Sequence, residues 1–320
     1  MMTDFDVTIR QVDPRDARAI LRTTLAADGQ SPAEIEAHVT LFLQYARDMQ
    51  LTPATHWQAE KDGRTVGACT CLESPGRTAM LFLPDGRLNL SPPGVISRLA
   101  ATVVEELLTR DVNLIQCLLA PNDESNTVAL RRAGFHELAE LLYLEWNATI
   151  DVPISMSPIA SVSPRLTWAT YDVNTENEFR EVIAASYVGS LDCPSLSQLR
   201  SIEDTMTSHK AAGRFDPTQW LLLRENGRAI GCNLLCENPL RPILEIVYMG
   251  VHPDARGKGH ARRLLRTGLS LAHHAGFTRV TLAVDAGNSP ALHLYRSEGF
   301  HETMRRRAFI RSIAPTSRAI

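Results

Sequence analysis

Hydrophobic and polar positions along this chain follow the periods of both strands and helices. The clearest stretch lies between residues 246 and 275. An apolar run over 246–251 predicts a strand, and leucines at 264, 265, 269 and 271 predict one buried face of a helix over 261–275. A loop with two glycines separates them. A second apolar run, 280–284, predicts the next strand.

The order of predicted elements occurs twice. The sequence Gly-Phe-His-Glu appears at 134–137 and again at 299–302, an offset of 165 residues. Asp62-Gly63 and Asn226-Gly227 each lie between apolar runs, which is a strong hairpin signal. Each half therefore predicts an opening strand, helices, a hairpin, a central strand, a loop, a long helix, a strand, a short helix and a closing strand.

This repeat predicts two tandem α/β (α+β) domains. We place the first at residues 1–150 and the second at residues 165–320. Residues 151–164 contain three prolines among serines, which is typical of a linker.

The loop between the strand and the long helix predicts an anion site. Gly257 and Gly259 allow close approach of a ligand to the backbone, and Arg256 and Lys258 add positive charge. A helix N-terminus supplies free N–H groups and the positive end of the helix dipole. Such a site suits a diphosphate.

Two motifs resemble those of the GNAT superfamily of N-acetyltransferases. Residues 256–261, RGKGHA, are similar to its R/Q-x-x-G-x-G/A signature, and residues 288–300 are similar to its N-x-x-A-x-x-L-Y-x-x-x-G-F pattern. The resemblance implies that each domain is a mixed, largely antiparallel twisted sheet flanked by helices. It also implies acetyl-CoA as co-substrate and no metal. The residues then expected to contact acetyl-CoA are Met249, Gly250, Val251, Arg256, Gly257, Lys258, Gly259, His260, Ala261, Asn288 and Tyr295.

Glu245 is the candidate general base. It lies in an apolar strand, where burial would raise the pKa of its carboxyl toward neutral pH. The alternative is that Glu245 only pairs with a cation such as Arg241. Period-two alternation is expected to place Glu245, Val247, Met249 and Val251 on one face of the strand and Ile246, Tyr248 and Gly250 on the other.

Tyr295 is the candidate general acid for the departing thiolate, a role that the resemblance implies. The alternative is a half-buried tyrosine that only packs. For the acceptor we single out the segment 185–193, which interrupts an apolar helix pattern, and its residues Tyr187 and Asp192, together with Tyr248. An ordinary interhelix loop is the alternative for this segment.

The two halves differ in chemistry. At the offset of 165, Met80 stands opposite Glu245, Leu130 opposite Tyr295, and Pro92-Pro93 opposite Gly257-Lys258. Proline has no N–H to offer a phosphate. We therefore expect the first half to be degenerate and non-catalytic. The resemblance extends to the tandem arrangement of the mycothiol synthases.

The predicted function is acyl-CoA-dependent N-acetylation of a primary amine of a small molecule. A protein or peptide N-acetyltransferase and a non-catalytic acyl-CoA-binding regulator are the alternatives. The net charge of −3 over 320 residues gives no general attraction to nucleic acid or anionic membranes. No apolar run is long enough to span a membrane, and the six cysteines are dispersed. We expect a cytoplasmic monomer or homodimer.

Overall fold

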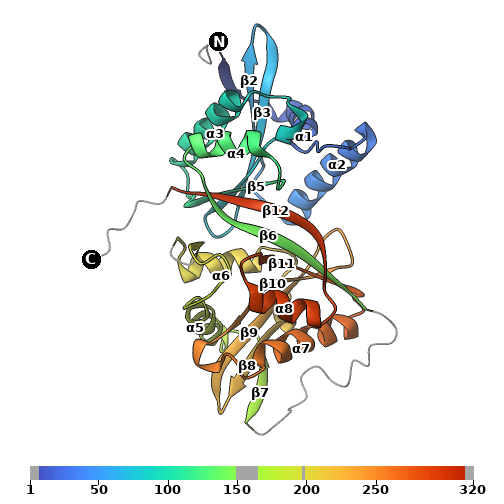
Figure 1. Cartoon of the computed structure of the whole chain (residues 1–320), viewed down its shortest axis with the longest axis vertical. Coiled ribbons are helices and arrows are strands. Elements are labelled where there is room, and N and C mark those ends of the chain that lie inside the picture. The colour runs from blue at the N-terminus through green and yellow to red at the C-terminus, as the bar shows by residue number, and fades with distance from the viewer. Residues whose placement is uncertain (1–6, 149–164, 197–198, 314–320) are drawn as a thin grey trace, which may run out of the picture. The chain divides into compact units, whose positions relative to one another are not determined.

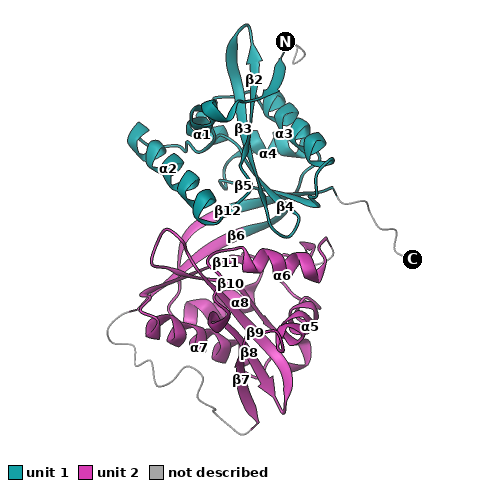
Figure 2. Cartoon of the chain, turned by 180° about the vertical axis from the view of Figure 1, so that it is seen from behind, with its two compact units in different colours: residues 1–140, 306–320 teal, residues 141–305 magenta. Residues whose placement is uncertain are grey.

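A computed structural model describes residues 7–148, 165–196 and 199–313. The predicted linker, residues 151–164, lies outside the described residues. The chain forms two compact units, one of residues 1–140 with 306–320 and the other of residues 141–305 (Figure 2).

The two units have the same order of strands and α-helices and differ in the places of their short 3-10 helices. The first contains β1 (Thr8–Gln11), η1 (Pro14–Asp16), α1 (Ala17–Thr24), α2 (Pro32–Asp48), β2 (Thr55–Lys61), β3 (Arg64–Ser74), β4 (Thr78–Phe82), η2 (Gly86–Leu88), α3 (Pro93–Leu107), β5 (Leu114–Leu119) and α4 (Glu124–Arg132). The second contains β7 (Leu166–Thr170), α5 (Glu176–Ser186), α6 (Ile202–Lys210), η4 (Pro217–Gln219), β8 (Trp220–Glu225), β9 (Arg228–Glu237), β10 (Leu244–Val251), η5 (Pro253–Ala255), α7 (His260–His274), β11 (Arg279–Asp285) and α8 (Ser289–Ser297). The closing strands are β6 (His136–Asn147) and β12 (His301–Ser312).

Each closing strand completes the sheet of the other sequence half. From residue 141 onward, β6 pairs antiparallel with β11, and from residue 307 onward, β12 pairs antiparallel with β5. The strand order is therefore β1-β2-β3-β4-β5-β12 in the first unit and β7-β8-β9-β10-β11-β6 in the second. This exchange is why the observed units differ from the expected division into 1–150 and 165–320.

Helices cover both faces of the second unit's sheet (Figure 1). Leu265 and Leu269 of α7 and Leu292 of α8 pack on one face, where Leu244 and Ile246 of β10 are buried. On the other face, α5 and α6 pack against strands β8 and β9, with Phe179 and Trp220 fully buried. The central strand β10 thus lies between two hydrophobic layers.

The predicted elements around the loop are confirmed. The strand expected at 246–251 is β10, and the helix expected at 261–275 is α7. Both hairpins turn where expected, because Asp62, Gly63, Asn226 and Gly227 all have positive φ. Two consecutive positive φ angles are typical of the type I′ turn that matches the twist of paired strands.

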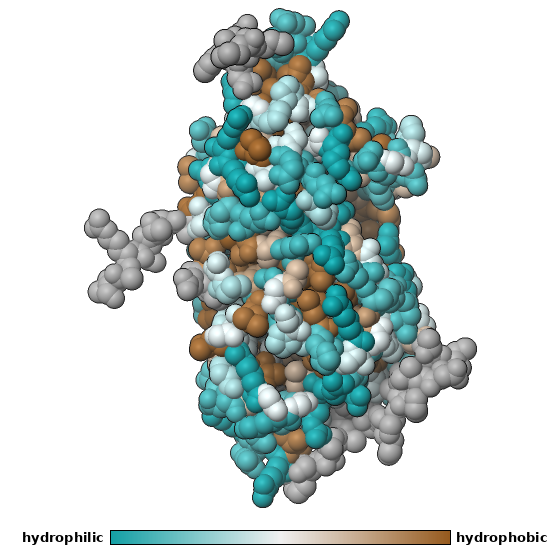
Figure 3. Space-filling model, in the orientation of Figure 1, coloured by the Kyte–Doolittle hydropathy of each residue, from teal (hydrophilic) through white to brown (hydrophobic). Residues whose placement is uncertain are grey.

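Hydrophilic residues are interspersed with hydrophobic ones on the face shown in Figure 3. None of the helices in the described part of the chain has the length and apolar character needed to cross a membrane. All six cysteines are free thiols, and all but Cys193 are buried.

Candidate functional site

The central strand of the second unit separates from its neighbour half-way along. β10 pairs in parallel with β11 only over Leu244–Ile246, opposite Val280–Leu282. Beyond that point β10 stays paired with β9 as far as Val251. One edge of residues 247–251 is therefore left without a partner strand, and this opening is the centre of the site.

A β-bulge at Val247 corrects the predicted side-chain alternation. The register against β9 shifts between Ile246 and Tyr248. An extra residue on one strand reverses the alternation beyond it. Glu245 therefore shares a face with Tyr248 and Gly250, on the side covered by α5 and α6, and not with Met249 and Val251. The expected grouping of Glu245 with Met249 and Val251 was wrong because period two assumes an unbroken strand.

The glycine loop presents a run of unused backbone donors. Gly257 and Gly259 have φ of 75° and 80°, and a Cβ built on either residue would meet no atom within 4 Å. No side chain caps α7 at its N-cap, Gly259. In the part of the chain that the structure describes, the N–H groups of residues 257–262 donate to no acceptor. This open cradle at a helix N-terminus fits a diphosphate.

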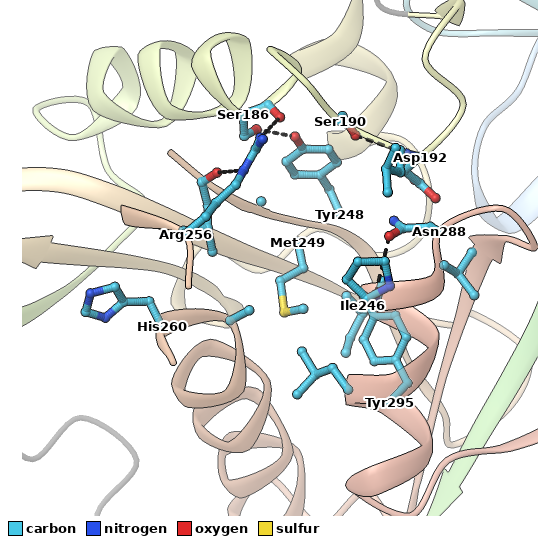
Figure 4. A pocket seen from close by; sticks show the side chains of 18 of the residues that line it. Ser186, Ser190, Asp192, Ile246, Tyr248, Met249, Arg256, His260, Asn288 and Tyr295 are labelled. Carbon is cyan, nitrogen blue, oxygen red and sulfur yellow. Dashed lines mark hydrogen bonds between the residues drawn. The ribbon is translucent and has the colours of Figure 1, made fainter. Parts of the chain in front are cut away.

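Arg256 and Lys258 are held by backbone carbonyl groups. Arg256 donates from Nη2 to the Ser186 carbonyl oxygen at 2.7 Å, from Nη1 to that of Gly189 at 3.3 Å, and from Nε to that of Val251 at 3.3 Å. Figure 4 shows its side chain reaching from the loop toward Ser186. The Lys258 Nζ donates to the Asp254 carbonyl oxygen at 2.9 Å.

A cavity of about 380 Å³ occupies the opening between β10 and β11. It is bordered by Tyr187 and Tyr248 from the α5 face and by Leu294 and Tyr295 from the α8 face. The cavity thus connects the two faces of the sheet. The residues predicted from sequence that line it are Tyr187, Asp192, Tyr248, Met249, Gly250, Val251, Arg256, Gly257, Gly259, His260, Ala261, Asn288 and Tyr295. Glu245 and Lys258 are not among its lining residues.

Tyr295 places a phenol at the α8 end of the cavity (Figure 4). The residue is 7% exposed, and its ring packs on Phe300 with centroids 5.6 Å apart. Its hydroxyl has no hydrogen-bond partner among the described residues. Burial, followed by the nearby Asp192 carboxylate, raises the pKa of the phenol, so Tyr295 stays protonated at neutral pH. Asn288 accepts the Ala291 N–H at 3.3 Å and so caps α8.

Glu245 is a half-buried carboxyl without a counter-ion. Burial raises its pKa to about 6, from an ordinary value of 4.5. Neither Arg241 nor any other cation in the described residues forms an ion pair with it, so the ion-pair alternative finds no support. Its neighbours across the sheet are Cys236 of β9 and Thr281 of β11.

The face of β10 that Glu245 shares carries a small polar and aromatic cluster. The Ser186 hydroxyl donates to the Ile183 carbonyl oxygen at 2.8 Å, so the Tyr248 hydroxyl, 2.5 Å away, donates to Ser186. The Tyr248 ring contacts His209 and Tyr187, with centroids 5.1 and 5.8 Å away. Burial, followed by the charge of Arg200, lowers the His209 pKa to about 3, which leaves the imidazole neutral.

The segment 187–193 is attached to the end of β11. The Asp285 N–H donates to the Asp192 carboxylate at 2.9 Å, and the Cys193 N–H donates to the Asp285 carboxylate at 3.1 Å. Val188 and Leu191 of this segment are exposed. The segment therefore borders the cavity with both apolar and acidic groups.

His260 is buried at the first turn of α7. Neither ring nitrogen has a hydrogen-bond partner in the described residues, and Nε2 lies 4.0 Å from the Glu225 carboxylate. Burial lowers the pKa of this imidazole. His260 therefore borders the anion cradle as a neutral group.

The first unit closes the corresponding region with its own chain. β4 ends at Phe82, the counterpart of Val247, and Gly86 then donates its N–H to the Asp123 carboxylate at 3.0 Å. Asp123 is the counterpart of Asn288 and caps α4. Leu130, the counterpart of Tyr295, is fully buried.

Sequence reasoning gave no individual role to three residues of the second unit. Ser186 forms hydrogen bonds with Tyr248 and Arg256, His209 contacts the Tyr248 ring, and Arg200 is close enough to His209 to lower its pKa. Ser186 falls within the segment flagged for the acceptor, but its partners are 62 and 70 residues away in sequence. No cluster of His, Cys, Asp or Glu side chains suited to a metal ion is found within the described ranges.

Comparison with known proteins finds a family match within the second unit. Residues 186–300 match the acetyltransferase (GNAT) family. A mycothiol acetyltransferase of Thermomonospora curvata is 39% identical over 100 residues, which span 31% of this chain and 33% of that relative. One from Arthrobacter sp. is 24% identical over 306 residues, covering 89% of this chain and 88% of the relative.

Solved structures confirm the predicted fold. A GCN5-related N-acetyltransferase from Sphaerobacter thermophilus superposes with a TM-score of 0.64 at 21% identity, covering 97% of this chain and 96% of that one. A tandem GNAT protein from the clavulanic acid biosynthesis pathway superposes with a TM-score of 0.54 at 16% identity, covering 98% and 100%. At these identities the likeness shows the fold alone.

Proposed function

We propose that this GNAT-family acetyltransferase transfers an acetyl group from acetyl-CoA to a primary amine of a small molecule. One observation carries the proposal. The split between β10 and β11 opens directly beside a helix N-terminus with unused N–H donors. A long ligand with a diphosphate at one end and a strand-like amide arm at the other fits this combination.

The residues present suit acetyl-CoA. Residues 257–262 would hold the diphosphate through backbone N–H groups, and the unpaired edge of Met249–Val251 would pair with the amide arm. When bound, acetyl-CoA supplies the thioester-activated acetyl group. A backbone N–H near Met249 would polarise the thioester carbonyl.

Two side chains would handle the protons. Glu245, with a pKa near 6, is ionised at neutral pH and would accept the proton that the amine loses as its bond to the acetyl carbon forms. Because Glu245 does not line the cavity, we propose that water relays this proton. Tyr295 would donate a proton to sulfur as the carbon–sulfur bond breaks.

The acceptor would lie against the α5 face, beside Tyr187 and Tyr248. Asp192 would favour an ammonium group at the cavity entrance. The limited volume of the cavity supports a small acceptor, and a relative that matches most of this chain is named a mycothiol acetyltransferase.

We also propose that the first unit is non-catalytic. Its chain folds onto Asp123 where the second unit has a cavity, and Pro92-Pro93 remove two N–H donors at the start of α3. Leu130 offers no proton in place of Tyr295.

The proposal is tested with the full chain. Calorimetry is expected to show one acetyl-CoA per chain, and thiol detection is expected to show amine-dependent release of coenzyme A across a panel of small amines. Binding without amine-dependent release would favour a non-catalytic acyl-CoA-binding protein. Absence of binding would refute the proposal.

A further inference from the structure

A second cavity, of about 520 Å³, lies beside the first in the second unit. The two share Tyr187, Gly189 and Ser190 as walls. Of the described residues that line the second cavity, Arg200 is the one that carries a charge. The second cavity is therefore a positively charged extension of the region beside Tyr187 where we place the acceptor.

Arg200 lacks the carboxylate partner that arginines nearby possess. Its Nη2 donates to the Asp204 carbonyl oxygen at 2.9 Å and to the Ser208 hydroxyl. Its Nε is buried without an acceptor, and within the described residues no carboxylate pairs with the guanidinium. By contrast, Arg180 pairs with Glu176 and Glu203.

This arrangement is unfavourable in the absence of an anion. A guanidinium taken out of water is stabilised by a paired anion, and burial lowers the pKa of Arg200. The two neutral acceptors hold the group in place, and the nearby Asp204 carboxylate, which forms no ion pair with it, offsets only part of the cost of burial. Tyr187 and Thr205 line the same cavity, but the Thr205 hydroxyl already donates to the Ser201 carbonyl oxygen at 2.9 Å, so Arg200 is the group available to bind an anion there.

We propose that this cavity binds an anionic oxygen group, a carboxylate or a phosphate, of the acceptor, with Arg200 as its anchor. This inference rests on the proposed acetyl transfer. The anion would sit beside Arg200, and the amine of the same molecule would extend past Tyr187 toward Tyr248 and β10. Arg200 is thus a specificity-determining residue that contacts the part of the acceptor remote from the reacting amine.

Anion binding is tested without catalysis. With coenzyme A saturating the first cavity, inorganic phosphate is added at constant ionic strength and the midpoint of thermal unfolding is measured. Phosphate is expected to raise the midpoint of the wild type and of the control Arg180→Gln. The rise is expected to be smaller for Arg200→Lys and absent for Arg200→Gln. An equal rise in wild type and Arg200→Gln would overturn the proposal, as would no rise in the wild type.

Specificity is tested with matched amines. The pairs are β-alanine with β-alaninamide, for the carboxylate, and phosphoethanolamine with ethanolamine, for the phosphate. For at least one pair, the wild-type kcat/KM is expected to be about 10-fold to 100-fold higher for the anionic amine than for its neutral counterpart. This is the range for a charge-assisted hydrogen bond. The Arg200→Gln variant is expected to lose this preference. The same preference in the wild type and in Arg200→Gln would overturn the proposal that Arg200 binds the anionic group. If the wild type acetylates none of the amines tested, that result would count against acetyl transfer. The phosphate titration would still decide whether Arg200 binds an anion.

Discussion

Replacing Glu245 by glutamine is expected to stabilise the protein while impairing its activity. The folded-state pKa of about 6 exceeds the ordinary value of 4.5 because burial disfavours the ionised form. A difference of about 1.5 pH units at about 1.36 kcal/mol each gives about 2 kcal/mol. The folded state holds this proton more tightly than the unfolded state. The contribution of the proton on Glu245 to the free energy of unfolding is therefore full below pH 4.5, and it is lost as the pH rises through 6.

At pH 7.5 the ionised carboxylate thus destabilises the fold, and Glu245→Gln removes that cost. The free energy of unfolding is expected to rise by up to about 2 kcal/mol at pH 7.5 and to change little at pH 4.5. Urea unfolding followed by tryptophan fluorescence at both pH values measures this. In kinetics, the wild-type kcat/KM is expected to rise with pH up to about 6 and then level off, and the variant is expected to lack this rising limb.

Glu237→Gln is the matched control. Glu237 ends the adjacent strand β9 and pairs with Arg214 at 3.5 Å, so its loss is expected to change stability by less than about 1 kcal/mol and to leave the pH profile intact. A Glu245→Gln protein that is less stable at pH 7.5, or equally altered at both pH values, would refute the burial argument. An unchanged pH profile would remove Glu245 as the base.

Three further substitutions probe the cavity. Tyr295→Phe is expected to lower kcat by about 100-fold with little change in the KM for acetyl-CoA, since only a proton donor is lost, and an unchanged kcat would exclude Tyr295 as the acid. Gly259→Val is expected to abolish acetyl-CoA binding in calorimetry because φ is 80° there and the side chain fills the cradle, whereas normal affinity would contradict a diphosphate at this loop. Gly250→Ala places a Cβ 2.6 Å from the Ser186 hydroxyl and 2.8 Å from the Tyr248 hydroxyl, so the KM of the acceptor is expected to rise, and an unaltered KM would place the acceptor elsewhere.

Local sequence signals predicted the loop and the elements on either side of it. A glycine pair between an apolar run and a helix pattern defines strand, loop and helix within about fifteen residues, so no distant contact is needed to recognise it. The same holds for the hairpin turns at Asp62-Gly63 and Asn226-Gly227.

Other features depend on tertiary contacts and could not be predicted in this way. The bulge at Val247 is a mismatch between two strands, and no residue type within β10 marks it. The role of Ser186 depends on Tyr248 and Arg256, which are distant in sequence. Arg200 is informative because no carboxylate among the described residues forms an ion pair with it, and a sequence does not show which charged groups pair in space.

The exchange of closing strands constrains how the chain can acquire its structure during synthesis. Phe309 of β12 is fully buried in the core of the first unit, although it is synthesised after the whole of the second unit. One edge of the first unit's sheet, at β5, therefore stays unpaired during synthesis until residues 307–312 have been made. A stop codon shortly after residue 300 would consequently damage the amino-terminal unit, and expressing the two halves as separate genes would require each fragment to capture a strand from the other.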